Sequence, residues 1–349
     1  MSSRRDQGAG DWALAPLIDI RDVCGRGGEG LVPASLLDGD PSSPTPRTRR
    51  EFHSSTTVCG EKIPDRLPVR VRRVWQGLLT SDRERQEAGL DARLCKRRAI
   101  TRTNLVAVVS PKGGVGKTTA TFLIGDLLAS RPKLRVLAID TNPDFGTLAK
   151  LAPDTHRSEH QLTDVIAHMD RIRSAPELDP FMSTTPAGLH LLGAPQRPEV
   201  MEEMTPALYG RLLSFLGRFY HVILVDLGTG LTEPLARFAL ERADQAVLVT
   251  TPDWIASSTV LDSLGYVLLR LGGHQVTMAT NKVARTAPAL THRLETSLRR
   301  HRIARRVEIP EDERLGKMLD QGTYVCEQLD RPTRHAVKRL ALAVAEQLV

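Results

Sequence analysis

A strand, a glycine-rich loop and a helix that follow one another between residues 104 and 129 constrain this chain most. Residues 104–110 (NLVAVVS) form a continuous apolar run, which predicts a strand buried on both faces. The loop at 112–119 (KGGVGKTT) comes next, and apolar side chains then recur at helical spacing over 120–128. Such a turn directs backbone amides and the positive end of a helix at one point, which favours phosphate binding.

The loop departs from the usual phosphate-loop pattern, G-x-x-x-x-G-K-[ST]. Five residues before Gly116 stands Pro111, which has no amide hydrogen to donate, and an extra cation, Lys112, follows it. The remaining residues fit the device: Lys117 would neutralise phosphate charge, and the hydroxyl of Thr118 would coordinate Mg²⁺. The predicted phosphate-binding residues are Gly113, Gly114, Val115, Gly116, Lys117, Thr118 and Thr119.

Strand and helix patterns alternate through the rest of the chain. Further apolar runs predict strands at 134–140, 221–226, 245–250, 275–280 and 305–309. This alternation predicts an α/β domain with a three-layer, doubly wound, mostly parallel sheet, of the P-loop nucleotide-binding class. Ligands bind such sheets at the carboxyl ends of the strands, where Asp226 ends the run HVILVD. A carboxylate there is the expected partner of the Mg²⁺ held by Thr118.

The loop with its extra Lys112 resembles the deviant phosphate loop of the MinD/ParA family of ATPases. Supporting motifs are VLAIDTNPDFGTLA (136–149), VILVDLGTG (222–230), TNKV (280–283) and VEIPEDERLGKMLDQG (307–322). The resemblance extends from about residue 104 to the C-terminus. It implies a homodimer in the ATP state, in which Lys112 reaches the ATP of the partner subunit. It also implies that Pro111 is no defect, because that position varies in the family.

The base and the cofactors follow from the same region. The run 281–284 is N-K-V-A, so the carboxylate of the guanine-reading N-K-x-D pattern is absent and adenine is favoured. The resemblance places Asn281 at the edge of the base and Pro310 beside its ring. The expected cofactors are therefore ATP and Mg²⁺. Relatives that bridge two subunits with an iron–sulfur cluster need paired cysteines in the middle of the domain, and none occurs between residues 96 and 325.

One position departs from the family pattern. The motif after the second strand is usually D-x-D, whereas this chain has Asp140-Thr141-Asn142. An amide can hold the attacking water but cannot accept its proton, so we expect slow hydrolysis, with Asp144 as a possible substitute. The resemblance thus implies catalytic roles for Lys112, Asp140 and Asn142 and metal ligands at Thr118, Asp140 and Asp226.

The first hundred residues are of a different kind. Residues 1–66 are expected to be disordered, because segments such as DGDPSSPTPRTRR (38–50) have little apolar surface to bury. Residues 67–103 predict a basic helical linker, with one apolar face over 71–79 that packs on the domain or lies on a membrane. The ATPase domain is assigned to 104–349. No run long enough to span a bilayer occurs, and the cysteines are widely spaced. A cytoplasmic location is therefore expected, either free or peripheral at the inner face of the membrane.

The surface on which the dimer acts stays open. Non-specific DNA is indicated by Arg299, Arg300, Arg302, Arg305 and Arg306, although such a run is more often a solvated helix end. A membrane is indicated by the amphipathic segment 331–349, which is more simply the last helix of the domain. The pattern D-x-N-P-D-x-G-T-L-A resembles actinobacterial MinD-like ATPases that accompany type VII secretion, which points to a protein partner.

Two functions remain. The first is an ATPase switch that positions or regulates a cellular machine in secretion, division or partitioning. The second is an essentially non-hydrolytic ATP sensor that docks a secretion or division partner through its N-terminal region. Asn142 favours the second, and the intact Lys112, Lys117, Asp140 and Asp226 favour the first.

Overall fold

The computed structural model describes residues 82–96, 100–131, 134–142, 146–273, 275–284 and 292–349. The predicted irregular segment 1–66, the apolar face predicted over 71–79, and Asp144 lie outside the described residues. Within the predicted linker, Asp82–Cys95 is a helix, α2.

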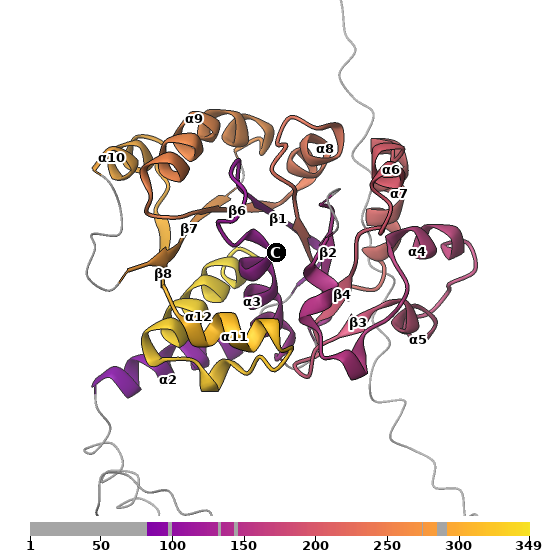
Figure 1. The fold of residues 1–349 in the computed structure, drawn as a ribbon, viewed down its shortest axis with the longest axis horizontal. Helices are drawn as coiled ribbons and strands as arrows, with labels where there is room; N and C mark the ends of the chain where they lie inside the picture. Colours follow the sequence, from indigo (N-terminus) through magenta and orange to yellow (C-terminus); the bar gives the residue numbers. More distant parts are fainter. Residues whose placement is uncertain (1–81, 97–99, 132–133, 143–145, 274, 285–291) are drawn as a thin grey trace, which may run out of the picture. The chain divides into compact units, whose positions relative to one another are not determined.

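An eight-stranded sheet runs through the described part of the chain in the order β3-β4-β2-β5-β1-β6-β7-β8 (Figure 1). Its strands are β1 (Asn104–Val109), β2 (Val136–Asp140), β3 (Ser183–Thr184), β4 (His190–Leu192), β5 (Val222–Asp226), β6 (Gln245–Thr250), β7 (Gln275–Val283) and β8 (Arg305–Pro310). Neighbours pair in parallel except β3, which is antiparallel to β4. Every predicted strand is present. The strands β3 and β4 were missed because two or three residues give no apolar run to detect.

The central strand β1 lies between β5 and β6, and the chain order reverses on its two sides. Its carboxyl end is therefore the topological switch point at which doubly wound sheets bind ligands. Asp140 and Asp226 are register partners at the ends of β2 and β5; β5 is the direct neighbour of β1, and β2 is the strand after it. The predicted phosphate loop and the predicted carboxylates thus meet at one edge of the sheet.

Helices cover both faces of the sheet (Figure 1). They are α2, α3 (Lys117–Ala129), α4 (Leu162–His168), α5 (Ala175–Leu178), α6 (Pro198–Glu202), α7 (Pro206–Leu216), α8 (Pro234–Arg242), α9 (Trp254–Arg270), α10 (His292–Arg300), α11 (Glu313–Asp320) and α12 (Arg331–Ala345). One apolar layer joins the sheet to α2, α3, α11 and α12. The other joins it to α4, α5 and α7–α10. Alternate strand residues enter the two layers, for example Val106 the first and Ala107 the second, which confirms the three-layer prediction.

The last helix belongs to the core. Val337, Leu340, Ala341 and Val344 of α12 are all buried, and the helix packs against α3 and β8. These are the apolar residues that made the segment amphipathic, so its interpretation as a domain helix is confirmed. On its polar side, the carboxylate of Glu87 in α2 accepts hydrogen bonds from the side chains of Arg334 and Lys338.

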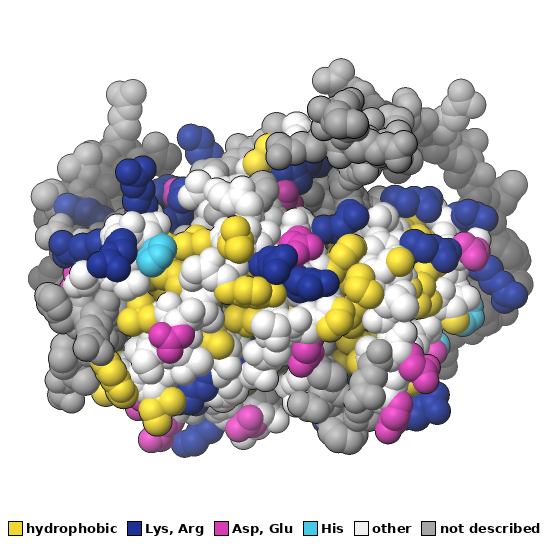
Figure 2. Space-filling view, turned by 90° about the horizontal axis from the view of Figure 1, so that it is seen from above, with side chains coloured by type: hydrophobic (Ala, Val, Ile, Leu, Met, Phe, Trp, Pro, Cys, Tyr) yellow, Lys and Arg dark blue, Asp and Glu magenta, His cyan; other side chains and the backbone are white. Residues whose placement is uncertain are grey.

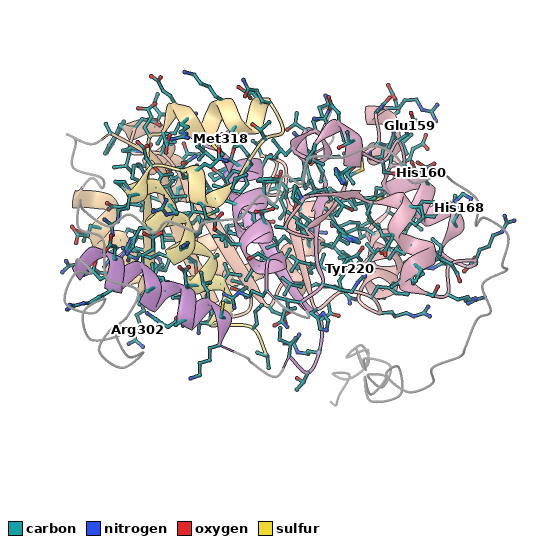
Figure 3. The ribbon with its side chains drawn as sticks, turned by 90° about the horizontal axis from the view of Figure 1, so that it is seen from below. Glu159, His160, His168, Tyr220, Arg302 and Met318 are labelled. Atoms are coloured by element: carbon teal, nitrogen blue, oxygen red, sulfur yellow. The ribbon has the colours of Figure 1, made fainter. Side chains whose placement is uncertain are left out.

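Near the edge strand β3, short elements are held together by contacts between aromatic rings. None of the predicted nucleotide-binding residues belongs to them. His160 and His168, labelled in Figure 3, place their rings 4.7 and 5.5 Å from the ring of Phe181. His190 of β4 contacts the hydroxyl of Tyr220 at 2.8 Å.

Candidate functional site

A cavity of about 670 Å³ opens at the carboxyl ends of the strands. Almost all of the residues predicted to bind the nucleotide line it: Gly113, Gly114, Gly116, Lys117, Thr118, Thr119, Asn281 and Pro310. The predicted residue Val115 does not line it, because its side chain points into the core. Of the other predicted site residues, Asn142 and Asp226 also line it, whereas Lys112 and Asp140 do not.

The glycine-rich loop takes a conformation that only glycine adopts easily. Gly114 and Gly116 have φ angles of 73° and 94°. Gly116 directly precedes α3 and offers no side-chain cap, so the first amides of the helix keep their donors for a ligand. A Cβ at Gly116 would lie 2.3 Å from Nδ2 of Asn281, which leaves no room for a larger residue.

Two side chains at the end of β7 hold this loop by hydrogen bonds to its carbonyl groups. Nδ2 of Asn281 donates to the carbonyl of Val115 at 2.9 Å, and Nζ of Lys282 donates to the carbonyl of Gly114 at 3.1 Å. Lys282 has a φ of 56°, which is rare for a residue with a side chain. The sequence motif predicted a base contact for Asn281 and gave no role to Lys282. In the structure both hold the phosphate loop.

A buried carboxylate, Asp226, and a half-buried ammonium, Lys117, interact behind the loop. Asp226 is 2% exposed, and Oγ1 of Thr118 donates to its Oδ2 at 2.5 Å. Burial raises the pKa of Asp226 to about 7 and lowers the pKa of Lys117, whose charge Asp226 in turn favours. Oδ1 of Asp226 is buried and has no hydrogen-bond partner among the described residues.

These residues fit a magnesium ion. A hydroxyl and a carboxylate in contact are hard oxygen ligands of the kind that Mg²⁺ prefers, and Oδ1 of Asp226 is an orphaned acceptor beside them. The predicted metal ligands Thr118 and Asp226 are therefore brought together.

The third predicted metal ligand, Asp140, makes its hydrogen bonds to the loop after β2. Its Oδ1 accepts the amide of Asn142 and its Oδ2 accepts the amide of Leu148, both at 3.0 Å, and the residue is 1% exposed. A Cβ at Gly146 would lie 2.3 Å from Oδ2, so a glycine is needed where the loop wraps this carboxylate. Burial raises the pKa of Asp140, and these amides oppose the rise. Asp140 does not line the cavity, and its contacts give it the role of holding the loop after β2.

Lys112 is also outside the cavity. Its Nζ forms an ion pair with Oδ1 of Asp253 at 2.9 Å, at the start of α9. The same carboxylate accepts a hydrogen bond from the hydroxyl of Thr251 and caps α9 by accepting the amide of Ala256, and these bonds, with that from Lys112, hold the pKa of Asp253 far below its usual range. Sequence reasoning gave Asp253 no role, although its place after β6, at the carboxyl edge, was a signal.

The far wall of the cavity comes from the segment after β8. Beyond the predicted Pro310 it includes Glu311, Asp312 and Leu315, with Asp312 capping α11 through the amides of Arg314 and Leu315. The sequence motif at 307–322 covered these residues but did not single them out. Carboxylates of this segment and the ammonium of Lys117 line the same cavity.

The predicted arginine cluster is partly neutralised. Arg299 pairs with Glu295 at 2.7 Å, and a nitrogen of Arg306 lies 3.9 Å from the same carboxylate. Arg305 donates to the side chain of Gln275. Arg300 and Arg302 are exposed. Among the described helices, none is long and apolar enough to cross a membrane.

Known proteins share this fold. A ParA family ATPase from Chlorobium tepidum superposes with a TM-score of 0.58 at 23% identity, over 69% of this chain and 98% of its own. MinD from Pyrococcus horikoshii, solved with Mg-ADP, has a TM-score of 0.56 at 22% identity, over 69% of this chain and 96% of its own. These likenesses show the fold.

Sequence similarity adds the family. The ESX-1 secretion-associated protein EspI of Mycobacterium tuberculosis is 31% identical over 168 residues, which are 48% of this chain and only 24% of EspI. The model of the CobQ/CobB/MinD/ParA nucleotide-binding domain matches residues 106–325, well over half of the chain, and the protein therefore belongs to that family.

Proposed function

We propose that this protein is an ATP-dependent molecular switch that binds Mg-ATP, forms a homodimer in that state and hydrolyses the nucleotide slowly. The observation that carries the proposal is the contact between Thr118 and Asp226, with an orphaned carboxylate oxygen, beside the half-buried Lys117. A buried carboxylate with an unpartnered oxygen is costly unless a ligand uses it.

Different groups of this chain bind the different parts of Mg-ATP. The free amides at the start of α3 and the ammonium of Lys117 bind the β- and γ-phosphates. Thr118 and Asp226 hold Mg²⁺, which when bound supplies charge neutralisation for the phosphates. Asn281 and Lys282 keep the loop in its phosphate-binding shape through the carbonyls of Val115 and Gly114. Adenine is the base favoured by the lack of a carboxylate at position 284, with Asn281 and Pro310 nearest to it.

Hydrolysis is expected to be slow. Asn142 lines the cavity near Asp226, where the attacking water must be oriented. Its amide can orient a water but cannot take up the proton, so catalysis depends on positioning and charge stabilisation alone. Asp140 supports Asn142 by accepting its backbone amide.

The position of Lys112 supports the proposed homodimer. Its ammonium lies outside its own cavity and is half-exposed, held by Asp253 at the rim. A lysine in that place is available to the phosphates of a facing subunit once Asp253 releases it. The relation to EspI supports a role beside a secretion system, with a protein partner. The exposed Arg300 and Arg302 leave non-specific DNA as a further surface.

The test is the solution mass of the full chain by light scattering in Mg-ATP and in Mg-ADP, followed over hours. We expect a dimer in Mg-ATP that decays to monomer as ADP accumulates. A dimer that never decays would replace the switch by an ATP sensor. A monomer in both nucleotides would contradict the proposed role of Lys112.

The rate is tested by the variant Asn142→Asp. We expect its turnover to exceed that of the wild type by about tenfold or more, because a carboxylate can accept the proton of the attacking water. Equal turnover of the two proteins would show that Asn142 does not limit hydrolysis.

A further inference from the structure

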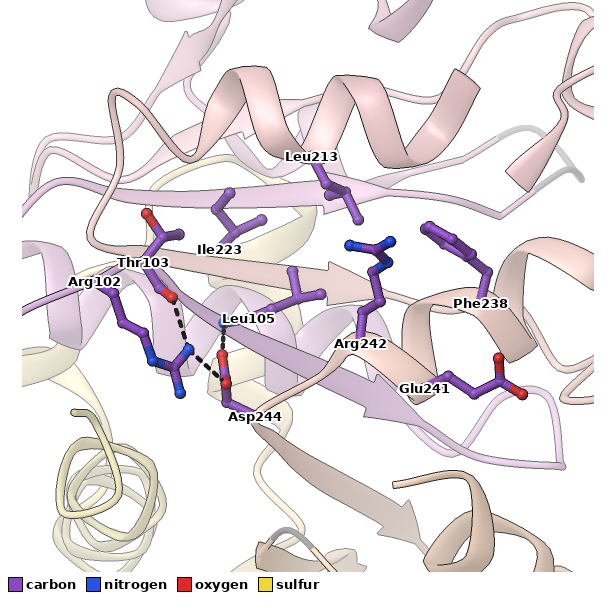
Figure 4. Close-up of a pocket in the computed structure, with 9 residues that line it drawn as sticks. All are labelled: Arg102, Thr103, Leu105, Leu213, Ile223, Phe238, Glu241, Arg242 and Asp244. Atoms are coloured by element: carbon purple, nitrogen blue, oxygen red, sulfur yellow. Dashed lines mark hydrogen bonds and ion pairs between the residues drawn. The ribbon is translucent and has the colours of Figure 1, made fainter. Parts of the chain in front are cut away.

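A second cavity, of about 450 Å³, lies at the opposite edge of the sheet (Figure 4). Leu105 and Ile223 stand at the second positions of β1 and β5, and Asp244 directly precedes β6, so the cavity is at the amino ends of the strands. Leu213 of α7 completes an apolar floor with Leu105 and Ile223. The nucleotide residues described above, at the carboxyl ends, take no part in it.

The cavity continues into a groove along α7. A neighbouring hollow of about 460 Å³ is lined by Arg211 and Phe215 of α7 and by Arg218 just after it, and it shares Phe238 and Arg242 of α8 with the first. We call the two together the α7–α8 groove. In Figure 4 the guanidinium of Arg242 lies between Leu213 and Phe238, where the two hollows meet.

The groove has an excess of positive charge. Arg211, Arg218 and Arg242 are exposed and form no ion pair with any residue that the structure describes. The nearby carboxylates Glu241 and Asp244 are already paired with Arg270 and Arg102, each at 2.7 Å. Asp170 is the acidic side chain left in the lining, against these three arginines and Arg173. The groove therefore complements a ligand of negative charge.

Aromatic rings hold two of the arginines in place. The guanidinium carbon of Arg242 lies 4.9 Å from the ring centre of Phe238, and that of Arg218 lies 5.5 Å from the ring centre of Phe219. Phe238 is itself fixed, because its ring packs into α7 where Gly210 has no side chain. A guanidinium stacked on a ring keeps its edge donors free and aimed in a fixed plane, which suits a carboxylate. Figure 2, which views the molecule from the side of α8–α10, shows Lys and Arg side chains among exposed hydrophobic ones.

We propose that the α7–α8 groove binds an acidic peptide segment of a partner protein, with one apolar side chain of the peptide on the floor of Leu105, Leu213 and Ile223. Carboxylates of the peptide pair with Arg242, Arg211 and Arg218. The enclosed apolar floor distinguishes this site from a surface for nucleic acid, which needs a run of phosphate contacts and offers no side chain to fill such a pocket. The site is independent of the proposed nucleotide switch.

The experiment is a selection from a random peptide display library on the full chain, followed by fluorescence anisotropy with the selected peptides. Enriched peptides are expected to carry Asp or Glu around one apolar residue. The double variant Arg211→Glu/Arg242→Glu is expected to weaken their binding by about tenfold or more, and added salt to weaken it further. The matched control is Arg237→Glu, an exposed arginine of α8 outside the groove, which keeps the affinity of the wild type.

Melting curves show whether the variants fold, and the charge-neutral pair Arg211→Gln/Arg242→Gln repeats the test if the first variant does not. Peptides without acidic residues, or binding that neither variant weakens, would overturn the proposal. Loss in both variants of binding to a labelled DNA duplex, with no acidic peptide selected, would assign the groove to nucleic acid instead. Competition by a peptide of residues 11–23 (DWALAPLIDIRDV) at comparable affinity would assign it to the chain itself and overturn the separate partner.

Discussion

The two edges of the sheet attract negative charge by different means. At the carboxyl edge, the donors are backbone amides at the start of α3 and one half-buried lysine, Lys117, all within eight residues of one loop. At the amino edge, the donors are exposed arginine side chains in α7, just after it and in α8, two of which lie over aromatic rings. The first arrangement depends on a backbone shape, and the second depends on how two helices pack.

This difference has consequences for specificity and for change. A backbone cradle with positive φ angles admits few substitutions, and it fixes the ligand as a phosphate chain. Side chains on helices can be exchanged one at a time, so the amino edge can change its ligand while the fold is kept. The two edges should therefore respond differently to mutation.

The largest effect is expected from Lys117→Ala. Loss of the charge-assisted contact that the half-buried ammonium makes should weaken ATP binding by about 100-fold, measured by anisotropy of a fluorescent ATP analogue. Binding of an acidic peptide at the amino edge should be unchanged. The matched control is Lys112→Ala in the same loop, whose ammonium is held by Asp253 outside the cavity, and it should change the affinity of the monomer by less than about threefold. Equal losses in both variants would contradict this geometry.

A smaller effect is expected from Gly116→Ala. The left-handed φ of 94° and the approach to Asn281 should lower the free energy of unfolding by about 2 kcal/mol, measured by urea denaturation. The control is Gly265→Ala in α9, where no atom lies within 4 Å of the new Cβ, and helix propensity should raise stability by about 0.5 kcal/mol. A harmless Gly116→Ala would mean that the loop is not rigid before the nucleotide binds.

The next effect is on the pH dependence of stability, and it distinguishes two buried carboxylates at the two ends of α3. Asp226 lies near its start, and Asp126 lies near its end, where burial raises the pKa of Asp126 to about 6. In the unfolded chain this carboxyl loses its proton near pH 4, so the wild type loses stability as pH rises from about 4 to 6. Asp126→Asn removes that slope and should be more stable above pH 7 by about 1 to 2 kcal/mol.

Melting at a series of pH values checks the Asp126 prediction. Asp262→Asn, an exposed carboxylate on α9, should keep the profile of the wild type. Mg-ATP should change what Asp226, whose pKa is about 7, contributes to the pH dependence of stability. It should leave the contribution of Asp126 unchanged. An unchanged slope in Asp126→Asn would mean that Thr185, which donates to this carboxylate at 2.8 Å, keeps it ionised.

The smallest effect is expected at the amino edge. Arg102→Gln removes a partly exposed ion pair with Asp244 and should lower the free energy of unfolding by less than about 1 kcal/mol, less still in high salt. Asp244→Ala should cost more, because Asp244 also accepts the amide of Leu105 at 2.7 Å. A larger loss from Arg102→Gln than from Asp244→Ala would reverse this order of contributions.

Much of the fold and of the phosphate site could be predicted because the relevant signals are local. A buried strand needs a short apolar run, and a phosphate loop needs glycines and a lysine within a few residues. The strands β3 and β4 were not predicted, because they are too short to show a periodic or continuous apolar pattern. The role of Asp140 as a metal ligand stays a prediction. That its carboxylate accepts the amides of Asn142 and Leu148 could not be predicted, because these bonds depend on the path of the chain after β2.

The sequence by itself determined the order of strands and helices, the phosphate loop and the carboxylate that ends β5, since each follows from neighbouring residues. Only the tertiary structure decided that Asn281 and Lys282 hold that loop from a strand more than 160 residues away. It also decided that Lys112 meets Asp253, and that Arg242 stacks on Phe238 above an apolar floor. The loop contacts, the Lys112–Asp253 pair and the apolar floor join residues far apart in the chain, whereas Arg242 and Phe238 lie one turn apart in α8. Packing of whole helices against the sheet sets these positions.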